Sequence, residues 1–135
     1  MFKSNTKNLK LILGEVKTIA LVGASSNKDR DSFKVMKFLK DCGYKVFPVN
    51  PNLANTKILG QRCYPSLLSI EKSIDMVDIF RAEEFIFEIT KDALSIKAKV
   101  LWTQLGLFCD KSKFLAEKEG LLVVMNQCPK KILED

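Results

Sequence analysis

Short apolar runs alternate with amphipathic segments along most of this chain. The apolar runs have the length and composition of strands buried on both faces, and they lie at 18–22, 45–51, 75–80, 99–104 and 121–125. Apolar residues at helical spacing predict helices at about 5–16 and 83–94, one that Asp31 or Ser32 caps and that stops at Gly43, and one from Asp110 or Ser112 to Gly120. No long helix is expected between the second strand and residue 74.

This alternation predicts an α/β fold with a doubly wound, mostly parallel sheet of about five strands, helices on both faces and right-handed crossovers. The 135 residues have the usual size of one domain, so residues 1–135 are expected to form a single domain with 1–17 as a helical lead-in. Pro48 is awkward inside a strand, which predicts an edge-like or irregular finish to the second strand.

The same pattern predicts the surroundings of particular side chains. The buried stripe of the helix at 83–94 is expected to hold Phe85, Ile86, Ile89 and Ala93. Asp75 and Asp78 fall on opposite faces of one strand, so they are not expected to share an acid–base site. Asp78 lies within an apolar run and is therefore expected to form hydrogen bonds with neighbouring backbone or with an arginine.

The chain is organised around the stretch from Thr18 to Ser32. A buried run ends there at Gly23, small polar residues follow, and a helical pattern then begins. Gly23 and Ala24 allow a ligand to approach the backbone, while the helix N-terminus offers free N–H groups and the positive end of a dipole to an anion. The stretch therefore predicts a phosphate-binding strand, loop and helix.

Small and polar residues follow every predicted strand. In a parallel sheet these positions meet in a crevice beyond the carboxyl ends of the strands, where the strand order reverses. They are Gly23-Ala24-Ser25, Asn50-Pro51, Phe80-Arg81, Gln104-Leu105-Gly106 and Gln127-Cys128-Pro129. The set suits an elongated polar ligand. NAD is disfavoured, because the loop lacks a full G-x-G-x-x-G and the second strand ends in Asn50-Pro51 where an acid would hold the ribose.

The composition excludes several kinds of catalytic centre and metal site. The chain has no histidine, which excludes an internal Ser-His-Asp or Cys-His centre and a His-ligated metal site. Its four cysteines form no C-x-x-C pair, so reduced thiols in a reducing compartment are expected. No secretory pattern and no apolar run of bilayer length is present, and the expected location is cytoplasmic.

The net charge of +6 comes mostly from lysines scattered along the chain. Such a charge suits a nucleic acid, an acidic membrane or a phosphorylated cofactor about equally. Because the sequence has no basic block with interleaved aromatic residues, a nucleic-acid-binding or regulatory role ranks below a cofactor-binding role. No membrane attachment is predicted.

Several separate motifs, taken in order, resemble those of a known family. They are Val22-Gly23-Ala24-Ser25, Arg30 with Ser32, the run 43–51, Ile58-Leu59-Gly60, the run 77–81, the run 102–106 and Cys128-Pro129. Together they resemble the small single-domain CoA-binding proteins. These proteins are similar to the N-terminal, Rossmann-like CoA-binding domain of the succinyl-CoA synthetase alpha subunit.

The resemblance implies a ligand and its contacts. The ligand would be coenzyme A (CoA) or an acyl-CoA, bound at the carboxyl ends of the strands. Its phosphates would lie against Gly23, Ala24, Ser25 and Ser26, with Arg30 and Ser32 nearby. Asn50 and Pro51 would border the nucleotide end, Phe80 and Arg81 would flank the middle of the ligand, and Gln104 would form the floor. Backbone donors and an arginine complement phosphate charge.

The chain also departs from the family pattern. Asp31 stands where relatives commonly have proline, and its negative charge is expected to weaken phosphate binding. Asn126 stands in place of an aspartate. The synthetase's catalytic histidine and second domain are missing, so its reaction is not implied.

No catalytic residue and no metal site are assigned, and the chain is not expected to be an enzyme by itself. Cys128 is expected to be a small residue packed beneath the ligand; a thiol nucleophile or a mixed disulfide with CoA is the alternative. The sequence does not predict which acyl group is carried, and both a protein partner and a homodimer are compatible with it. An NAD(P)-binding oxidoreductase remains the alternative from fold analogy.

Overall fold

A computed structural model of the protein describes residues 6–134, so the predicted start of the first helix at Asn5 lies outside the described residues. The helices are α1 (Thr6–Glu15), α2 (Asp31–Asp41), α3 (Glu83–Ser95), α4 (Asp110–Lys118) and α5 (Pro129–Glu134). The main strands are β1 (Thr18–Val22), β2 (Lys45–Val49), β5 (Met76–Ile79), β6 (Val100–Thr103) and β7 (Leu122–Val124). Two short strands, β3 (Lys57–Ile58) and β4 (Gln61–Arg62), and the 3₁₀ turns η1 (Pro51–Leu53) and η2 (Leu67–Ser69) fill the segment between β2 and β5.

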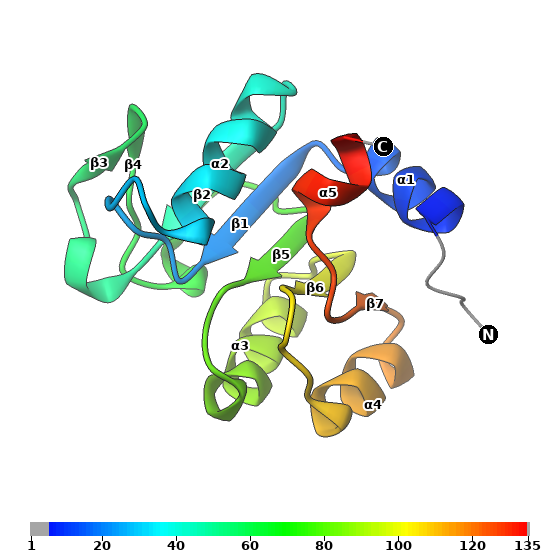
Figure 1. Cartoon of the computed structure of the whole chain (residues 1–135). Coiled ribbons are helices and arrows are strands. Elements are labelled where there is room, and N and C mark those ends of the chain that lie inside the picture. Colours follow the sequence, from blue (N-terminus) through cyan, green and yellow to red (C-terminus); the bar gives the residue numbers. More distant parts are fainter. Residues whose placement is uncertain (1–5, 135) are drawn as a thin grey trace.

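The five main strands form one parallel sheet in the order β2-β1-β5-β6-β7 (Figure 1). The predicted α/β class and five-stranded parallel sheet are confirmed. β2 lies at one edge, as Pro48 predicts, because a residue without an N–H group is best placed where a strand has a single partner. The strand order reverses between β1 and β5, and this is where α/β sheets bind ligands.

Helices cover both faces of the sheet (Figure 1). On one face, buried side chains of α1, α2 and α5 pack on alternate strand residues, with Leu13, Leu39 and Ile132 against Ile19 and Leu21. On the other face, α3 and α4 contribute Ile86, Ala93 and Ala116, which pack with Ala20 and Val77. The strands are buried on both sides, which accounts for their nearly continuous apolar composition.

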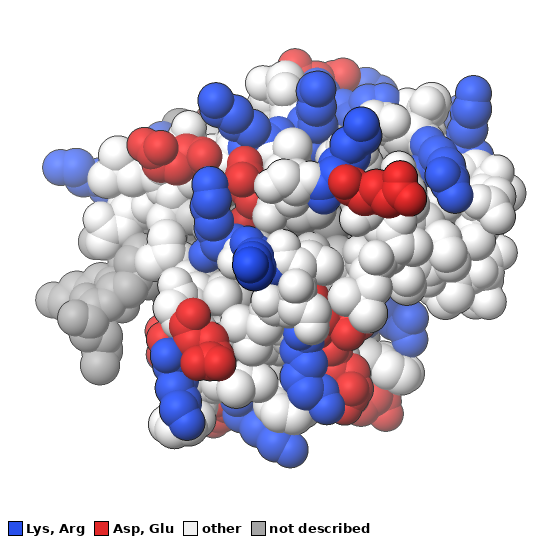
Figure 2. Space-filling model, turned by 180° about the vertical axis from the view of Figure 1, so that it is seen from behind, with Lys and Arg blue, Asp and Glu red and all other residues white. Residues whose placement is uncertain are grey.

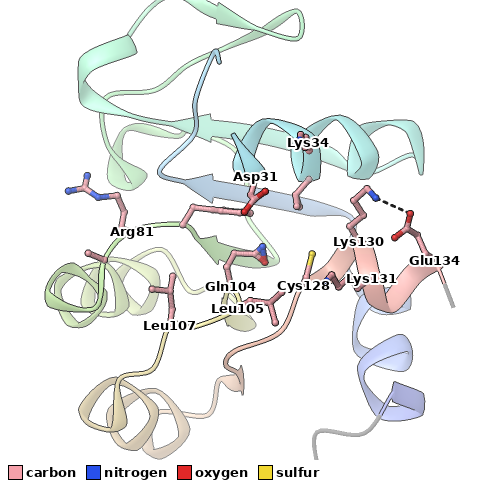
Figure 3. Close-up of a pocket in the computed structure, with 13 residues that line it drawn as sticks. Asp31, Lys34, Arg81, Gln104, Leu105, Leu107, Cys128, Lys130, Lys131 and Glu134 are labelled. Carbon is pink, nitrogen blue, oxygen red and sulfur yellow. Dashed lines mark hydrogen bonds and ion pairs between the residues drawn. The ribbon is translucent and has the colours of Figure 1, made fainter. Parts of the chain in front are cut away.

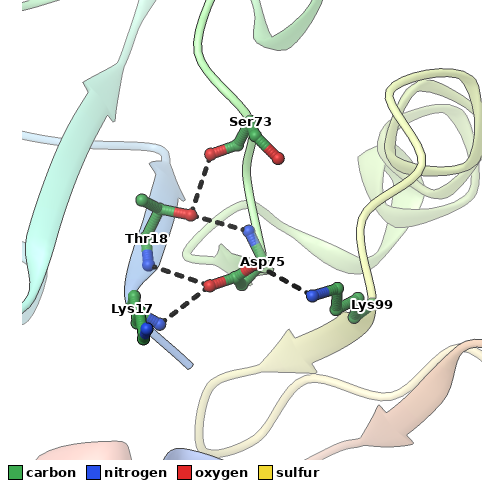
Figure 4. A network of polar contacts seen from close by, with 5 residues as sticks. All are labelled: Lys17, Thr18, Ser73, Asp75 and Lys99. Carbon is green, nitrogen blue, oxygen red and sulfur yellow. Dashed lines mark hydrogen bonds and ion pairs between the residues drawn. The ribbon is translucent and has the colours of Figure 1, made fainter. Parts of the chain in front are cut away.

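Asp75 joins three segments at the amino-terminal edge of the sheet (Figure 4). Its Oδ2 accepts hydrogen bonds from the backbone N–H groups of Lys17 at 2.8 Å and Thr18 at 3.3 Å. Its Oδ1 lies 3.6 Å from the Lys99 ammonium nitrogen, and its own N–H donates to the Thr18 hydroxyl oxygen at 2.9 Å. Partial burial acts to raise the pKa of Asp75, but these N–H groups and Lys99 outweigh it and lower the pKa.

Asp78 is the main departure from the sequence-based expectation. It lies on β5 between Leu21 of β1 and Trp102 of β6, and its side chain is fully buried. The predicted hydrogen bonds to backbone or to an arginine are wrong, because neither carboxyl oxygen has a partner among the described residues. Arg81 cannot serve, since it lies beyond the end of the strand on the crevice side. Burial therefore raises the pKa of Asp78 well above its usual range.

Two smaller predictions are also corrected. Neither Asp31 nor Ser32 caps α2, because the helix already begins at Asp31, and its N-cap residue Arg30 makes no side-chain cap hydrogen bond. Asp31 lies in the first turn instead, where its negative charge interacts favourably with the positive end of the helix dipole. Phe85 is 43% exposed rather than buried, although Ile86 and Ala93 of the same predicted stripe are buried and Ile89 is partly so. The predicted stop at Gly43 is confirmed, with Gly43 at φ +100° just after the helix.

Replacing Asp75 by asparagine tests the network at the amino-terminal edge. Because the folded-state pKa is lowered, the charged Asp75 contributes stability above about pH 3.8, and this contribution is lost as the pH falls through the folded-state pKa. We expect Asp75→Asn to lower the free energy of unfolding by about 1–2 kcal/mol at pH 7 and by progressively less toward pH 3. Urea unfolding at several pH values measures this. Lys99→Ala is the control and should cost under about 1 kcal/mol, because that lysine is exposed.

Asp78 should make the free energy of unfolding depend on pH in the opposite sense. Its folded-state pKa is raised, so the unfolded chain ionises first and the free energy of unfolding falls as the pH rises above about 3.8. Asp78→Asn removes this ionisation, and we expect the variant to exceed the wild type by on the order of 1 kcal/mol or more at pH 7. The free energies of unfolding of the wild type and of Asp78→Asn should converge near pH 3. A difference that does not change with pH would contradict the assigned burial of the carboxyl group.

Candidate ligand-binding site

Gly23 is the point at which the ends of three strands meet. Its N–H and that of Ala24 donate to the carbonyl oxygen of Val49, at 3.0 and 3.2 Å, at the end of β2. The Phe80 N–H donates to the Val22 oxygen at 2.8 Å at the end of β5. Gly23 has φ +94°, and a Cβ there would lie 2.7 Å from the Phe80 carbonyl oxygen. Only glycine therefore satisfies both the backbone conformation and the close approach.

The loop after Gly23 is shaped by hydrogen bonds between residues two positions apart in the sequence. The Ser25 hydroxyl oxygen accepts from the N–H of Asn27 at 3.0 Å, and the Asn27 side-chain oxygen accepts from the N–H of Asp29 at 2.9 Å. Asn50, which follows β2, donates its side-chain N–H to the Ala24 carbonyl oxygen at 2.8 Å. Asn50 thus holds the loop in place, a role that its position in the sequence does not reveal.

A cavity of about 560 Å³ opens beside this loop, and we call it the polar pocket. Most of its lining is polar and comes from the loop, the first turn of α2, and the residues that follow β2 and β5. The lining residues are Gly23, Ala24, Ser25, Asp29, Arg30, Asp31, Ser32, Asn50, Asn52, Phe80 and Arg81. Backbone N–H groups in the first turn of α2 have no partner within the helix, so the pocket has the donors and the dipole that favour an anion.

A second cavity of about 460 Å³ borders the first, and we call it the apolar pocket (Figure 3). The two pockets share Asp31, Phe80 and Arg81 and together form one crevice. The apolar pocket lies between α2, α5 and the segments that follow β5 and β6. The remaining lining residues are Lys34, Val35, Ala82, Gln104, Leu105, Leu107, Cys128, Lys130, Lys131 and Glu134.

Arg81 lies at the junction of the two pockets. Its guanidinium carbon is 4.1 Å from the centroid of the Phe85 ring, so the exposed Phe85 supports the arginine instead of filling the core. In Figure 3 the Arg81 side chain points away from the apolar pocket. This position leaves the fixed positive charge available to an anion in the polar pocket.

Gln104 forms part of the floor of the apolar pocket. Its backbone N–H donates to the Ile79 oxygen at 3.2 Å, and the residue is buried, with 7% of its surface exposed. The side-chain oxygen Oε1 has no hydrogen-bond partner among the described residues. Asn126 holds the neighbouring loop, since its side-chain oxygen accepts a hydrogen bond from the N–H of Gly106 at 2.6 Å.

Cys128 enters the apolar pocket from the start of α5. The Trp102 indole N–H donates to the carbonyl oxygen of the preceding residue, Gln127, at 2.8 Å. The Ile132 N–H donates to the Cys128 carbonyl oxygen at 3.2 Å, which begins the helix. The backbone on both sides of the thiol is therefore fixed, and the cysteine is free and partly exposed.

The structure brings together most of the residues that the sequence predicted. Eight of them line the polar pocket, namely Gly23, Ala24, Ser25, Arg30, Ser32, Asn50, Phe80 and Arg81. Gln104 lines the apolar pocket, whereas Ser26 and Pro51 are exposed and line neither. α5 and its lysines were not predicted, although Pro129 followed by good helix formers is a typical helix start.

The described residues hold no group of three or more Cys, Asp or Glu side chains arranged to bind a metal ion. None of the described helices is long and apolar enough to cross a membrane. On the face opposite the view of Figure 1, basic and acidic side chains are mixed and separated by uncharged residues, with no continuous basic surface (Figure 2).

The chain is similar to proteins from bacteria and archaea. It is 36% identical to the uncharacterized protein YneT of Bacillus subtilis over 122 residues, which are 90% of this chain and 89% of that protein. The solved structure of a hypothetical protein from Pyrococcus horikoshii superimposes with a TM-score of 0.91 at 36% identity, covering 99% of this chain and 97% of that one.

Larger enzymes contain a similar segment. An ADP-forming acetate–CoA ligase of Methanocaldococcus jannaschii is 38% identical over 63 residues, which are 47% of this chain and 9% of the ligase. The chain thus corresponds to a small part of the ligase. Residues 17–134 match the family described as the CoA binding domain, which includes every strand of the sheet and the whole crevice. The resemblance seen in the sequence is confirmed, and the chain belongs to the CoA-binding domain family.

Proposed function

We propose that this protein binds CoA or an acyl-CoA along the crevice, with the phosphates in the polar pocket and the pantetheine arm in the apolar pocket. The observation that carries the proposal is that the two pockets are adjacent, since Asp31, Phe80 and Arg81 line both. CoA has the same division, since a phosphorylated nucleotide at one end is joined to a flexible, mostly apolar arm at the other. Each pocket is within the usual size range of a ligand site.

The polar pocket suits the pyrophosphate. Gly23 allows a close approach to the backbone, and the first turn of α2 directs unpaired N–H groups toward the pocket. Arg30 and Arg81 add two guanidinium groups that can bind phosphate oxygens in pairs. We keep Ser26 and Pro51 as proposed contacts at the outer rim, which a ligand longer than the pocket would reach.

The apolar pocket suits the pantetheine arm. Val35, Phe80 and Leu107 supply apolar surface, and the methylene stems of the lysines extend it. Oε1 of Gln104 is buried without a partner, and a turn of the side-chain amide toward the pocket would let it accept from one of the two amide N–H groups of the pantetheine arm. An amide there would satisfy a group that the protein leaves without a partner.

We further propose that the chain acts as one CoA-binding domain, without a reaction of its own, in the cytoplasm. The family match does not favour an NAD(P)-dependent oxidoreductase or a nucleic-acid-binding protein, and Asn50 holds the loop where an oxidoreductase would place an acid on the ribose. Calorimetric titration of CoA and, in parallel, of NADH tests the proposal. CoA should bind more tightly, and preferential binding of NADH would reverse the assignment.

Arg81→Ala tests the position of the phosphates. Removal of a guanidinium group that pairs with phosphate should weaken CoA binding by about tenfold to a hundredfold. Arg62→Ala is the matched control, because Arg62 also lies over an aromatic ring, that of Tyr64, but lines neither pocket. Its affinity for CoA should equal that of the wild type. Equal affinities for all three proteins would show that Arg81 does not contact the phosphates.

Asp31→Asn tests the expected repulsion at the site. Asp31 lines both pockets, so removing its charge should strengthen CoA binding by roughly twofold to tenfold, most clearly at low salt. The same change should lower stability by about 0.5 kcal/mol, because an acidic residue in the first turn favours the helix dipole. Asp41→Asn, at the far end of α2, is the control and should leave affinity unchanged. Weaker binding by Asp31→Asn would mean that Asp31 accepts a ligand hydrogen bond.

A further inference from the structure

The thiol of Cys128 faces the apolar pocket at the end away from Arg81. Figure 3 shows the sulfur pointing into the cavity from the start of α5, beyond the Gln104 side chain. The Trp102 indole fixes the backbone before it, and the first turn of α5 fixes the backbone after it. The thiol is therefore held in the crevice rather than carried on a loose loop.

Gln104 supplies an independent sign that a ligand reaches this end of the pocket. Its side chain projects into the same cavity, the residue is 7% exposed, and Oε1 has no partner among the described residues. A buried acceptor without a partner is destabilising, and a donor brought by a ligand would relieve it. An amide N–H is such a donor. In CoA the last amide is separated from the sulfur by only two methylene groups.

From this placement we propose that Cys128 is a thiol–disulfide exchange site for the CoA sulfur. The inference rests on the proposed function, since it requires the pantetheine arm to lie in the apolar pocket. With the last amide on Gln104, the terminal sulfur of the arm reaches the part of the pocket that Cys128 lines. The protein would then hold CoA covalently as well as by contacts.

The co-reactant of the exchange is a disulfide of CoA. The Cys128 thiolate attacks one sulfur of that disulfide, a new S–S bond joins Cys128 to one CoA, and the original S–S bond breaks. The second CoA leaves as a thiolate and takes up the proton that Cys128 released. No further oxidant is needed, because one disulfide is consumed and one is formed. A reduced thiol in excess reverses the reaction.

The other cysteines provide internal comparisons. Cys42 is exposed but lies at the opposite end of the strands, beside Tyr44 and Lys45, and lines neither pocket of the crevice. Cys63 is buried, and burial raises the pKa of its thiol. Cys109 is partly exposed but also lines neither pocket. A reaction governed by exposure alone would favour Cys42, whereas a reaction governed by CoA binding favours Cys128.

Peptide mapping by mass spectrometry distinguishes these outcomes. The reduced full-length protein is incubated with limiting CoA disulfide and, separately, with 2-hydroxyethyl disulfide, which lacks the nucleotide. We expect CoA disulfide to modify Cys128 faster than Cys42 by roughly tenfold or more, because binding raises the local concentration of the disulfide. The small disulfide should favour Cys42. Dithiothreitol should remove the adduct.

Three variants complete the experiment. Cys128→Ser should lose the adduct, whereas Cys42→Ser should keep the Cys128 adduct and still bind reduced CoA in calorimetry. Arg81→Ala should slow modification of Cys128 and leave that of Cys42 unchanged. If reduced CoA binds but CoA disulfide modifies the cysteines in the order of their exposure, with Cys42 fastest, the inference is overturned and the proposed function stands. If reduced CoA does not bind at all, the proposed function itself fails.

Discussion

The crevice depends on the close approach of Gly23 to the backbone of Phe80. The hydrogen bonds from Gly23 and Ala24 to Val49 and from Phe80 to Val22 join the ends of β1, β2 and β5 at one point. A side chain at Gly23 would meet the Phe80 carbonyl group, so a larger residue would push β5 away from β1. The strand order reverses at this same junction. One backbone contact therefore fixes the relative positions of the loop, Asn50 and Arg81.

Much of the fold follows from the sequence because apolar runs report burial directly. A parallel sheet is covered on both faces, so strands such as Val100–Thr103 are continuously apolar and easily recognised. The site follows from the same logic, since residues directly after a strand must lie at the carboxyl edge of the sheet. Gly23, Arg81 and Gln104 follow β1, β5 and β6 and line the two pockets for this reason.

The remaining features depend on contacts between distant segments, which a local pattern does not encode. Phe85 has helical spacing with the core residues of α3, yet it lies outside and supports Arg81. Asn50 lines the polar pocket, and its amide also holds the loop after β1, which its position in the sequence does not reveal. Hydrogen bonds are predicted for Asp78 because buried carboxyl groups usually have them. Only the packed structure shows that its neighbours in the sheet, Leu21 and Trp102, offer none.

Buried polar groups without a partner occur both in the lining of the crevice, at Gln104, and within the sheet, at Asp78. Asp78 and Gln104 hold three of the four buried side-chain atoms that lack partners among the described residues. Alternation along β5 and β6 places both side chains on the face covered by α2 and α5, which also bounds the apolar pocket. A core selected for stability alone would fill these positions with apolar residues. Local loss of stability at a ligand site is the usual cost of keeping polar groups ready for a ligand, and the unpartnered Gln104 in the lining of the apolar pocket is consistent with a crevice built for binding.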